Sequence, residues 1–213
     1  MRKQSVLVGA GAVGAALVLL VSGCSSTGEA GHEQDGHDQG THEQESTSET
    51  AAAHNDADVA FARDMIPHHE QAIVMSDIIL AKQGIDSRVT ELATEIKAAQ
   101  DPEIETMRGW LREWGSPPMP PGHEGHDMSG GMSAHEAMGM MTDEQLEALR
   151  QAQGADAGRL FLDGMIEHHE GAVRMAQSEL TSGQSEAAKH LAREIIESQQ
   201  REIEAMKAIL GSL

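Results

Sequence analysis

Apolar residues recur at helical spacing over two stretches of this 213-residue chain, residues 56–115 and residues 156–213. A glycine-containing turn interrupts each stretch once, at Gly84 in the first and at Gly183 in the second. The spacing therefore predicts two helices in each stretch. The expected helices span residues 58–83, 87–114, 156–182 and 185–210.

The two stretches resemble each other in sequence. Residues 61–80, FARDMIPHHEQAIVMSDIIL, align with residues 161–180, FLDGMIEHHEGAVRMAQSEL. Further on, residues 92–107 align with residues 191–206 after a shift of one position. Neither helical hairpin could bury its apolar face alone, so the two should pack against each other. We predict an all-α fold, a ferritin-like four-helix bundle built from two repeated helical hairpins.

The first 54 residues have a different character. Residues 1–23 begin with Met-Arg-Lys and continue as a short apolar run, which is typical of a signal peptide rather than of a membrane-spanning helix. The sequence VSGC that ends at Cys24 resembles a lipobox, so Cys24 is the expected lipidation site. Residues 24–54 are polar and rich in His and Glu, and should form a disordered tether before the bundle domain, residues 55–213. The protein should then lie outside the cytoplasm, anchored to the cell membrane by lipidated Cys24.

The chain is strongly acidic, with 35 acidic and 15 basic residues and a formal charge of −20 at pH 7. Such a chain should repel nucleic acid and anionic lipid headgroups. We therefore expect no nucleic-acid partner, and contact with the membrane through the lipid anchor only. With one cysteine, no disulfide can form within the chain, so a hydrophobic core must hold the bundle together.

The repeated motif places two adjacent histidines on the apolar face of the first helix in each hairpin. On a helical wheel, His68 and His69 lie toward the two flanks of the stripe that contains Met65, and Met75 lies at its edge. Neighbouring side chains on a helix diverge by about 100°, so the two rings should face different helices. The second copy repeats the arrangement with Met165, His168, His169 and Met175.

The second helix of each hairpin carries polar residues and a methionine on its inner face. They are Gln100, Glu103 and Met107 in the first hairpin, and Gln199, Glu202 and Met206 in the second. A buried carboxyl or amide without a partner is costly, so these groups should meet the histidines. For a single buried histidine, hydrogen bonding without an ion would be the simpler interpretation. Four inward histidines with two glutamates and six methionines instead indicate a metal site.

The segment that connects the hairpins, residues 116–141, is rich in methionine and histidine and has no helical stripe. Methionine cannot be explained there as core filler, so we interpret the segment as a secondary site that captures metal and contributes nothing to the core. Its candidate ligands are Met119, His123, His126, Met128, Met132, His135, Met138, Met140 and Met141. A short helix should follow, because Thr142 and Gln145 have the spacing of a capping box.

The ligand types favour copper. Imidazole and thioether suit copper, Cu(I) above all, whereas iron and manganese prefer carboxylates. A di-iron bundle needs about four inward carboxylates, and only Glu103 and Glu202 point inward, since Glu70 and Glu170 lie on the other side of their helices. We expect the protein to bind Cu(I), Cu(II) or both, with no metal required for folding.

These motifs resemble those of the bacterial domain of unknown function 305, a ferritin-like four-helix domain. The family pattern is similar to F…MI.HH..A..M followed by Q..EI..M. It is present as Phe61, Met65, Ile66, His68, His69, Ala72 and Met75, then Gln100, Glu103, Ile104 and Met107. It is present again as Phe161, Met165, Ile166, His168, His169, Ala172 and Met175, then Gln199, Glu202, Ile203 and Met206. The resemblance covers residues 55–213 and implies a secreted or lipid-anchored protein, with copper binding among the functions of its members.

The sequence as a whole predicts an extracytoplasmic copper-binding lipoprotein that buffers copper ions or transfers them. Two alternatives stay open, a ferritin-like metal-dependent oxidase and a metal-free envelope interaction module. The few inward carboxylates and the absence of tyrosine disfavour the oxidase. Metal ions are the expected partners, and the sequence leaves open whether the chain also forms a homo-oligomer or meets a copper-donor or copper-acceptor protein.

Overall fold

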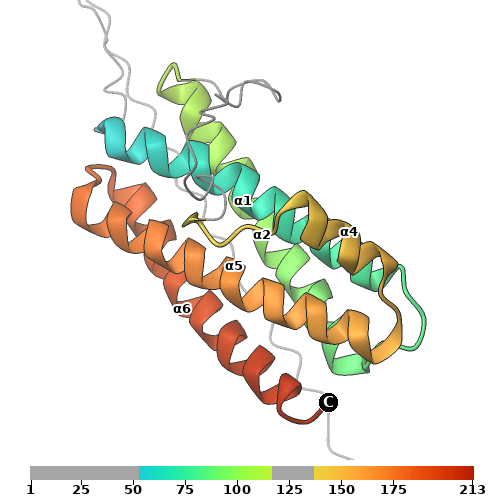
Figure 1. The fold of residues 1–213 in the computed structure, drawn as a ribbon. Helices are drawn as coiled ribbons and strands as arrows, with labels where there is room; N and C mark the ends of the chain where they lie inside the picture. Colours follow the sequence, from blue (N-terminus) through green and yellow to red (C-terminus); the bar gives the residue numbers. More distant parts are fainter. Residues whose placement is uncertain (1–52, 117–136) are drawn as a thin grey trace, which may run out of the picture. The chain divides into compact units, whose positions relative to one another are not determined.

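The computed structural model describes residues 53–116 and 137–213, and within these ranges it contains five α-helices and no strand (Figure 1). The helices are α1 (Asp56–Leu80), α2 (Ser87–Glu113), α4 (Asp143–Gln151), α5 (Gly154–Ser182) and α6 (Glu186–Leu210). The all-α prediction is confirmed, and the helix ends lie close to those predicted. The predicted signal peptide, Cys24 and most of the tether lie outside the described residues.

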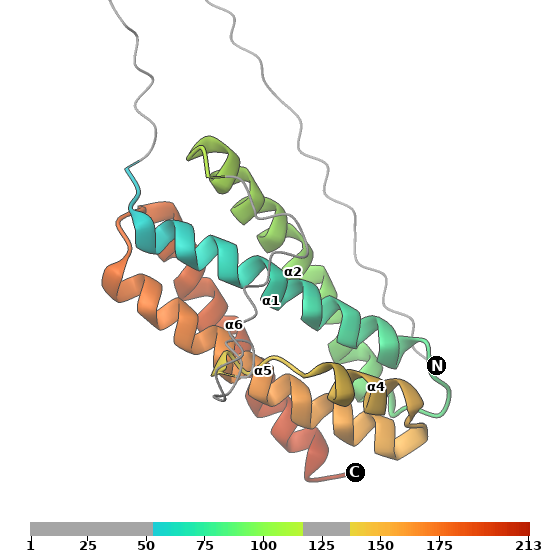
Figure 2. The same cartoon turned by 45° about the horizontal axis from the view of Figure 1, so that its top comes forward.

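The helices form two hairpins, α1 with α2 and α5 with α6. The hairpins meet mainly where α1 lies against α5, while α2 and α6 contact each other less. The short helix α4 contacts both α1 and α5 (Figure 2). The first hairpin turns at Gly84, whose φ of 71° lies in the left-handed region that favours glycine. This is the predicted four-helix bundle of two helical hairpins.

Capping side chains fix where two of the helices begin. The side chain of Asn55 accepts hydrogen bonds from the backbone N–H groups of Ala57 and Asp58, so α1 begins two residues before the predicted start. The backbone N–H of Gln145 donates to Thr142 Oγ1 at 3.2 Å, and the backbone N–H of Thr142 donates to Gln145 Oε1 at 2.7 Å. The capping box predicted for the short helix is therefore confirmed.

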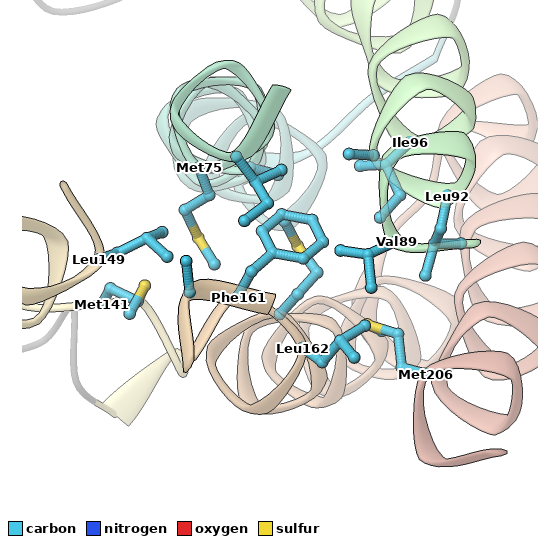
Figure 3. Packing of buried hydrophobic residues seen from close by; sticks show 14 of the residues in the cluster. Met75, Val89, Leu92, Ile96, Met141, Leu149, Phe161, Leu162 and Met206 are labelled. Carbon is cyan, nitrogen blue, oxygen red and sulfur yellow. The ribbon is translucent and has the colours of Figure 1, made fainter. Parts of the chain in front are cut away.

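Buried apolar side chains form two clusters that use opposite halves of the four long helices. The first cluster combines the C-terminal halves of α1 and α6 with the N-terminal halves of α2 and α5, and it includes α4. Phe161, Met75 and Met206 belong to this cluster, which we call the Phe161 cluster (Figure 3). The second, the Phe61 cluster, uses the remaining halves of the same four helices. The histidine pairs occupy the positions between the two clusters on α1 and α5.

A buried carboxyl pair ties the start of α1 to the turn between α5 and α6. Asp58 is fully buried and accepts hydrogen bonds from the backbone N–H groups of Asn55, Gln184 and Ser185. Glu179 is 2 % exposed, and its pKa is raised to about 8 by burial and by a hydrogen bond to Asp58. Glu179 is therefore mostly protonated at neutral pH, the form in which it can donate a hydrogen bond to Asp58, whereas an ionised Glu179 would have no donor for either oxygen among the described residues.

This pair should make the stability of the bundle depend on pH. Between about pH 4.5 and about pH 8 the folded chain keeps the Glu179 proton that the unfolded chain releases, so the free energy of unfolding should fall by a few kcal/mol as the pH rises through this window. Glu179→Gln keeps a hydrogen-bond donor but cannot titrate, and should flatten that slope. Urea unfolding across the window measures both slopes, with the exposed Glu186→Gln as control. Equal slopes for the wild type and Glu179→Gln would contradict the assignment.

The last residues of the connecting segment contribute to the core, contrary to the prediction from sequence. Met140 and Met141 are 8 % and 9 % exposed, and Met141 belongs to the Phe161 cluster. They are buried because Gln71 on α1 pairs with the backbone of Met141 and Gly164 on α5 leaves room for the Met141 side chain. We call residues 137–141 the strap. Of the other candidate ligands of the segment, Met138 lies in the strap and is partly buried. Met119, His123, His126, Met128, Met132 and His135 lie outside the described residues.

Candidate metal centre

The four motif histidines form a buried layer between the two hydrophobic clusters. His68, His69, His168 and His169 are all 0 % exposed. The rings of His68 and His168 face each other from α1 and α5, with ring centroids 3.6 Å apart. Within each pair the centroids are farther apart, 6.5 Å for His68 and His69 and 6.3 Å for His168 and His169. The expected divergence of adjacent rings is confirmed, and the pairing across the bundle brings the two hairpins' histidines together.

The outer histidine of each pair contacts a glutamate of the neighbouring helix. His69 Nε2 lies 2.6 Å from Glu103 Oε2 on α2, and His169 Nε2 lies 2.6 Å from Glu202 Oε2 on α6. The expectation that the inward glutamates meet the histidines is confirmed. A carboxylate only accepts hydrogen bonds, so Nε2 of each ring carries the hydrogen of this contact. Nδ1 of each ring has no partner among the described residues.

Several buried polar atoms of this layer have no hydrogen-bond partner among the described residues. They are Nδ1 of His68, His69, His168 and His169, Nε2 of His168, both amide atoms of Gln100, and Oε1 of Gln199. A buried polar atom without a partner costs about 1–3 kcal/mol, and native proteins contain few of them. A group of such atoms in one layer leaves hydrogen-bonding and ligand positions that water molecules or a bound ion would satisfy.

Burial keeps the inner histidines neutral. Desolvation is the main cause that lowers the pKa of His68 to about 3, and the neighbouring His69 adds to it. The pKa of His168 is lowered well below its ordinary value by the same desolvation and by His68. At neutral pH both rings are therefore in the unprotonated form that binds metal ions.

Thioether side chains lie on both sides of the histidine layer. Met65, Met107, Met165, Met206 and Met75 are all 0 % exposed, and Met175 is partly buried. The Phe61 cluster holds Met65 and Met107 and packs against Met175. The Phe161 cluster holds Met75 and Met206 (Figure 3), together with Met165. The structure thus divides the six predicted sulfur ligands into two groups of three, related by the sequence repeat.

The carboxylates that the sequence placed outside the site do lie outside it. Glu70 pairs with Arg108, and Glu170 lies 3.7 Å from the ammonium group of Lys207, both in partly exposed positions. Across residues 53–116 and 137–213, no three His, Cys, Asp or Glu side chains gather in a way that could hold one ion. The donor atoms of the layer itself are imidazole nitrogens, and the thioether sulfurs lie in the clusters on either side of it.

Sequence reasoning missed one contact of the layer. His68 Nε2 lies 3.1 Å from the carbonyl oxygen of Met138, so the strap contacts the histidine through its backbone. The signal for this contact is weak in the sequence. Gly139 and Gly171 mark a place where two backbones approach closely, since a Cβ atom at Gly171 would lie 1.6 Å from the Met138 carbonyl oxygen.

The fold and the site together define a helical bundle with a buried layer of histidines between two thioether groups. A model of the family described as domain of unknown function (DUF305) matches residues 58–210. The chain therefore belongs to the DUF305 family. No curated protein matches the chain.

Solved structures of similar proteins agree with the family. A DUF305 fragment from Deinococcus radiodurans is 30 % identical, with a TM-score of 0.66 over 75 % of this chain and 98 % of that one. A DUF305 protein from Streptomyces coelicolor, described as a candidate secreted protein, is 35 % identical, with a TM-score of 0.63 over 73 % of this chain and 91 % of that one. CopM in its Cu(I)-bound form is 32 % identical, with a TM-score of 0.58 over 73 % of this chain and 96 % of that one. CopM has also been solved with Cu(II) and with silver bound.

None of the helices in residues 53–116 and 137–213 combines the length and the apolar character needed to cross a bilayer.

Proposed function

We propose that this protein binds copper ions in the buried histidine layer, outside the cytoplasm, and buffers them or passes them on. One observation carries the proposal. Four fully buried imidazoles keep an Nδ1 atom without a partner, in a layer flanked by six methionines. The similarity to CopM, which has been solved with copper bound, supports the same assignment.

The choice of copper follows from the donor atoms. Thioether sulfur is a soft ligand that selects Cu(I), and imidazole suits both oxidation states of copper. Iron, manganese and magnesium prefer oxygen ligands, and Glu103 and Glu202 are engaged by histidines. Silver is a soft monovalent ion like Cu(I), and CopM has been solved with silver bound.

In this proposal Nδ1 is the ligand atom of the outer histidines, and the two glutamates are positioning residues. Glu103 accepts the Nε2 hydrogen of His69 and Glu202 accepts that of His169, which fixes both tautomers with Nδ1 free. Carboxylate partners of this kind orient a metal-binding imidazole and raise its basicity. Gln100 and Gln199 are buried in the same layer and could contribute an amide oxygen.

The remaining parts of the sequence prediction belong to the proposal as well. Lipidated Cys24 would hold the bundle at the outer side of the cell membrane, and the candidate secreted protein among the similar structures supports a location outside the cytoplasm. Because Met140 and Met141 are buried in the bundle, we assign capture to the part of the connecting segment before the strap, with Met119, Met128 and Met132 as its thioether ligands.

The metal content of the protein tests the proposal. The chain should be purified without a histidine tag and titrated anaerobically with Cu(I) against a chromophoric chelator, and in parallel with Zn(II). We expect tight Cu(I) binding that Zn(II) in excess does not displace, because zinc does not favour thioether ligands. Preferential binding of Zn(II), or no tight binding of either ion, would overturn the proposal.

The capture role of the connecting segment predicts a separate result. Replacing residues 119–136 with a Gly/Ser linker of equal length should leave the bundle folded, because every described core residue is kept. It should reduce the number of weakly held Cu(I) ions per chain and leave the tight binding unchanged. Far-ultraviolet circular dichroism checks the fold and equilibrium dialysis counts the ions. An unchanged count would show that the segment does not capture metal.

A further inference from the structure

The histidine layer is closed, so an ion cannot reach it unless part of the protein moves. All four motif histidines are 0 % exposed. The helices around them are held by the two hydrophobic clusters, which extend along both halves of every long helix. The strap is the described element that contacts the layer without being part of a long helix, through the hydrogen bond between His68 Nε2 and the Met138 carbonyl.

The strap is held to the bundle by a small number of polar contacts. The Gln71 side chain on α1 donates from Nε2 to the Met141 carbonyl at 2.9 Å and accepts at Oε1 from the Met141 N–H at 2.7 Å. Arg174 on α5 donates to the Ala137 carbonyl at 3.3 Å. Gln71 therefore hydrogen-bonds to both the N–H and the carbonyl of Met141, as a neighbouring β-strand would.

Close packing against α5 completes the closure. A Cβ atom at Gly171 would lie 1.6 Å from the Met138 carbonyl oxygen, and one at Gly139 would lie 2.2 Å from the Glu167 carbonyl oxygen. Gly139 also has a φ of 80°, in the region that favours glycine. The strap backbone can lie on α5 only because both positions lack a side chain.

The two copies of the sequence repeat contribute differently to this closure. Gln71 of the first hairpin corresponds to Gly171 of the second hairpin. The Gln71 side chain holds the strap by hydrogen bonds, whereas Gly171, which has no side chain, leaves room for the strap backbone. His68 donates to the strap, whereas His168, its counterpart, has no partner for either ring nitrogen among the described residues. The strap thus contacts both copies of the repeat at one equivalent position, and the two copies carry different residues there.

We propose that the strap is a gate over the histidine layer, held shut by Gln71 and seated on Gly171, and that its release admits the metal ion to His68 and His168. This inference rests on the proposed function, since it concerns entry to the same site. Opening the strap in advance should raise the rate of metal uptake and leave the number of tightly bound ions unchanged, because no proposed ligand of the layer is altered.

Two variants open the strap by different means, and each has a matched control. Gly171→Ala inserts a methyl group where the Met138 carbonyl lies, and Gly158→Ala makes the same change on α5 where the new Cβ would meet only Val89 at 3.9 Å. Gln71→Leu removes the clamp, and Gln177→Leu makes the same change at an exposed position of α5. Both alanine substitutions should favour the helix by themselves, so a difference between them reports on the strap.

The experiment measures strap opening and metal uptake in the same proteins. Amide hydrogen exchange of Met141 reports opening. Quench-flow mixing with Cu(I), stopped by excess chromophoric chelator, reports uptake. We expect both Gly171→Ala and Gln71→Leu to speed exchange and to raise the uptake rate at least about tenfold, with both controls like the wild type. A tenfold change corresponds to about 1.4 kcal/mol, the scale of one hydrogen bond.

The outcomes separate this inference from the proposed function. Tight Cu(I) binding with an unchanged uptake rate in the variants would overturn the gate and leave the copper site standing. Unchanged exchange in both variants would overturn the claim that these contacts hold the strap. Failure of the wild type to bind Cu(I) tightly at all would overturn the proposed function, and the gate with it.

Discussion

Replacing His68 and His168 together with alanine should lower the affinity of the protein for Cu(I) at least about tenfold. The two rings face each other at 3.6 Å between α1 and α5, and they bring three unpartnered ring nitrogens into the buried layer. Removing both takes away ligands from each hairpin, and loss of metal ligands or of their partners typically changes affinity by about 10–100-fold. Competition titration with a chromophoric Cu(I) chelator measures the change.

The double variant needs a control for general effects of losing histidine. His190→Ala removes a histidine whose side chain is 68 % exposed on α6, far in sequence from the motif, and should leave the affinity unchanged. The helical content of the double variant should persist, because each histidine lies well inside a helix whose apolar contacts remain. Equal Cu(I) affinity in the double variant and the wild type would remove the inner histidines from the site.

Phe161→Ala should destabilise the fold by about 3–5 kcal/mol, the usual cost of deleting a buried aromatic ring. Phe161 is 0 % exposed and belongs to the cluster that joins all four long helices and α4 (Figure 3). Because a closely packed core relaxes only partially when a large side chain is removed, much of the cavity should remain. Urea unfolding followed by circular dichroism measures the loss.

The adjacent residue supplies the control for this second substitution. Leu160 is 39 % exposed on the same turn of α5, and Leu160→Ala should change the free energy of unfolding by well under about 1 kcal/mol. A similar loss for both variants would mean that the cluster around Phe161 does not hold the bundle together.

The helices and their inner faces could be predicted from the sequence because both depend on local spacing. Apolar residues three and four positions apart define a helix and its buried face together, so His68 and His168 could be placed inside the bundle before any contact was known. That Glu103 would meet a histidine followed from the same geometry, since an inward carboxylate requires a partner, and the structure identifies that histidine as His69. Helix ends were predicted less closely where a cap decides them, as at Asn55.

The strap and the carboxyl pair could not be predicted, because both depend on contacts between residues far apart in the chain. The Met138 carbonyl meets His68 across 70 residues, and Asp58 meets the N–H of Ser185 across 127. Neither contact lies on a periodic stripe. The methionine content of the strap suggested that it captures metal. The burial of these methionines depends instead on the contacts of Gln71, a residue that the helical pattern treats as an ordinary polar position.

The sequence repeat is also an incomplete guide to the site. It predicts equal roles for Met75 and Met175, yet Met75 is fully buried and Met175 is only partly buried. The carboxyl pair shows the same limit, since Asp58 and Glu179 correspond to Gly158 and Ile79 in the other copy. Each hairpin keeps the histidines and glutamates of the layer, and the two differ in what surrounds them.

X-ray absorption at the copper edge of the Cu(I)-loaded protein tests the proposed site most directly, because it identifies the ligand atoms without any mutation. The protein should be loaded with one equivalent of Cu(I) under anaerobic conditions, so that the tightest site fills first. A site in the histidine layer predicts scattering from imidazole nitrogen together with thioether sulfur, since the layer holds the imidazoles and the clusters on either side of it hold the methionines. A first shell of oxygen alone, or one without imidazole, would contradict it.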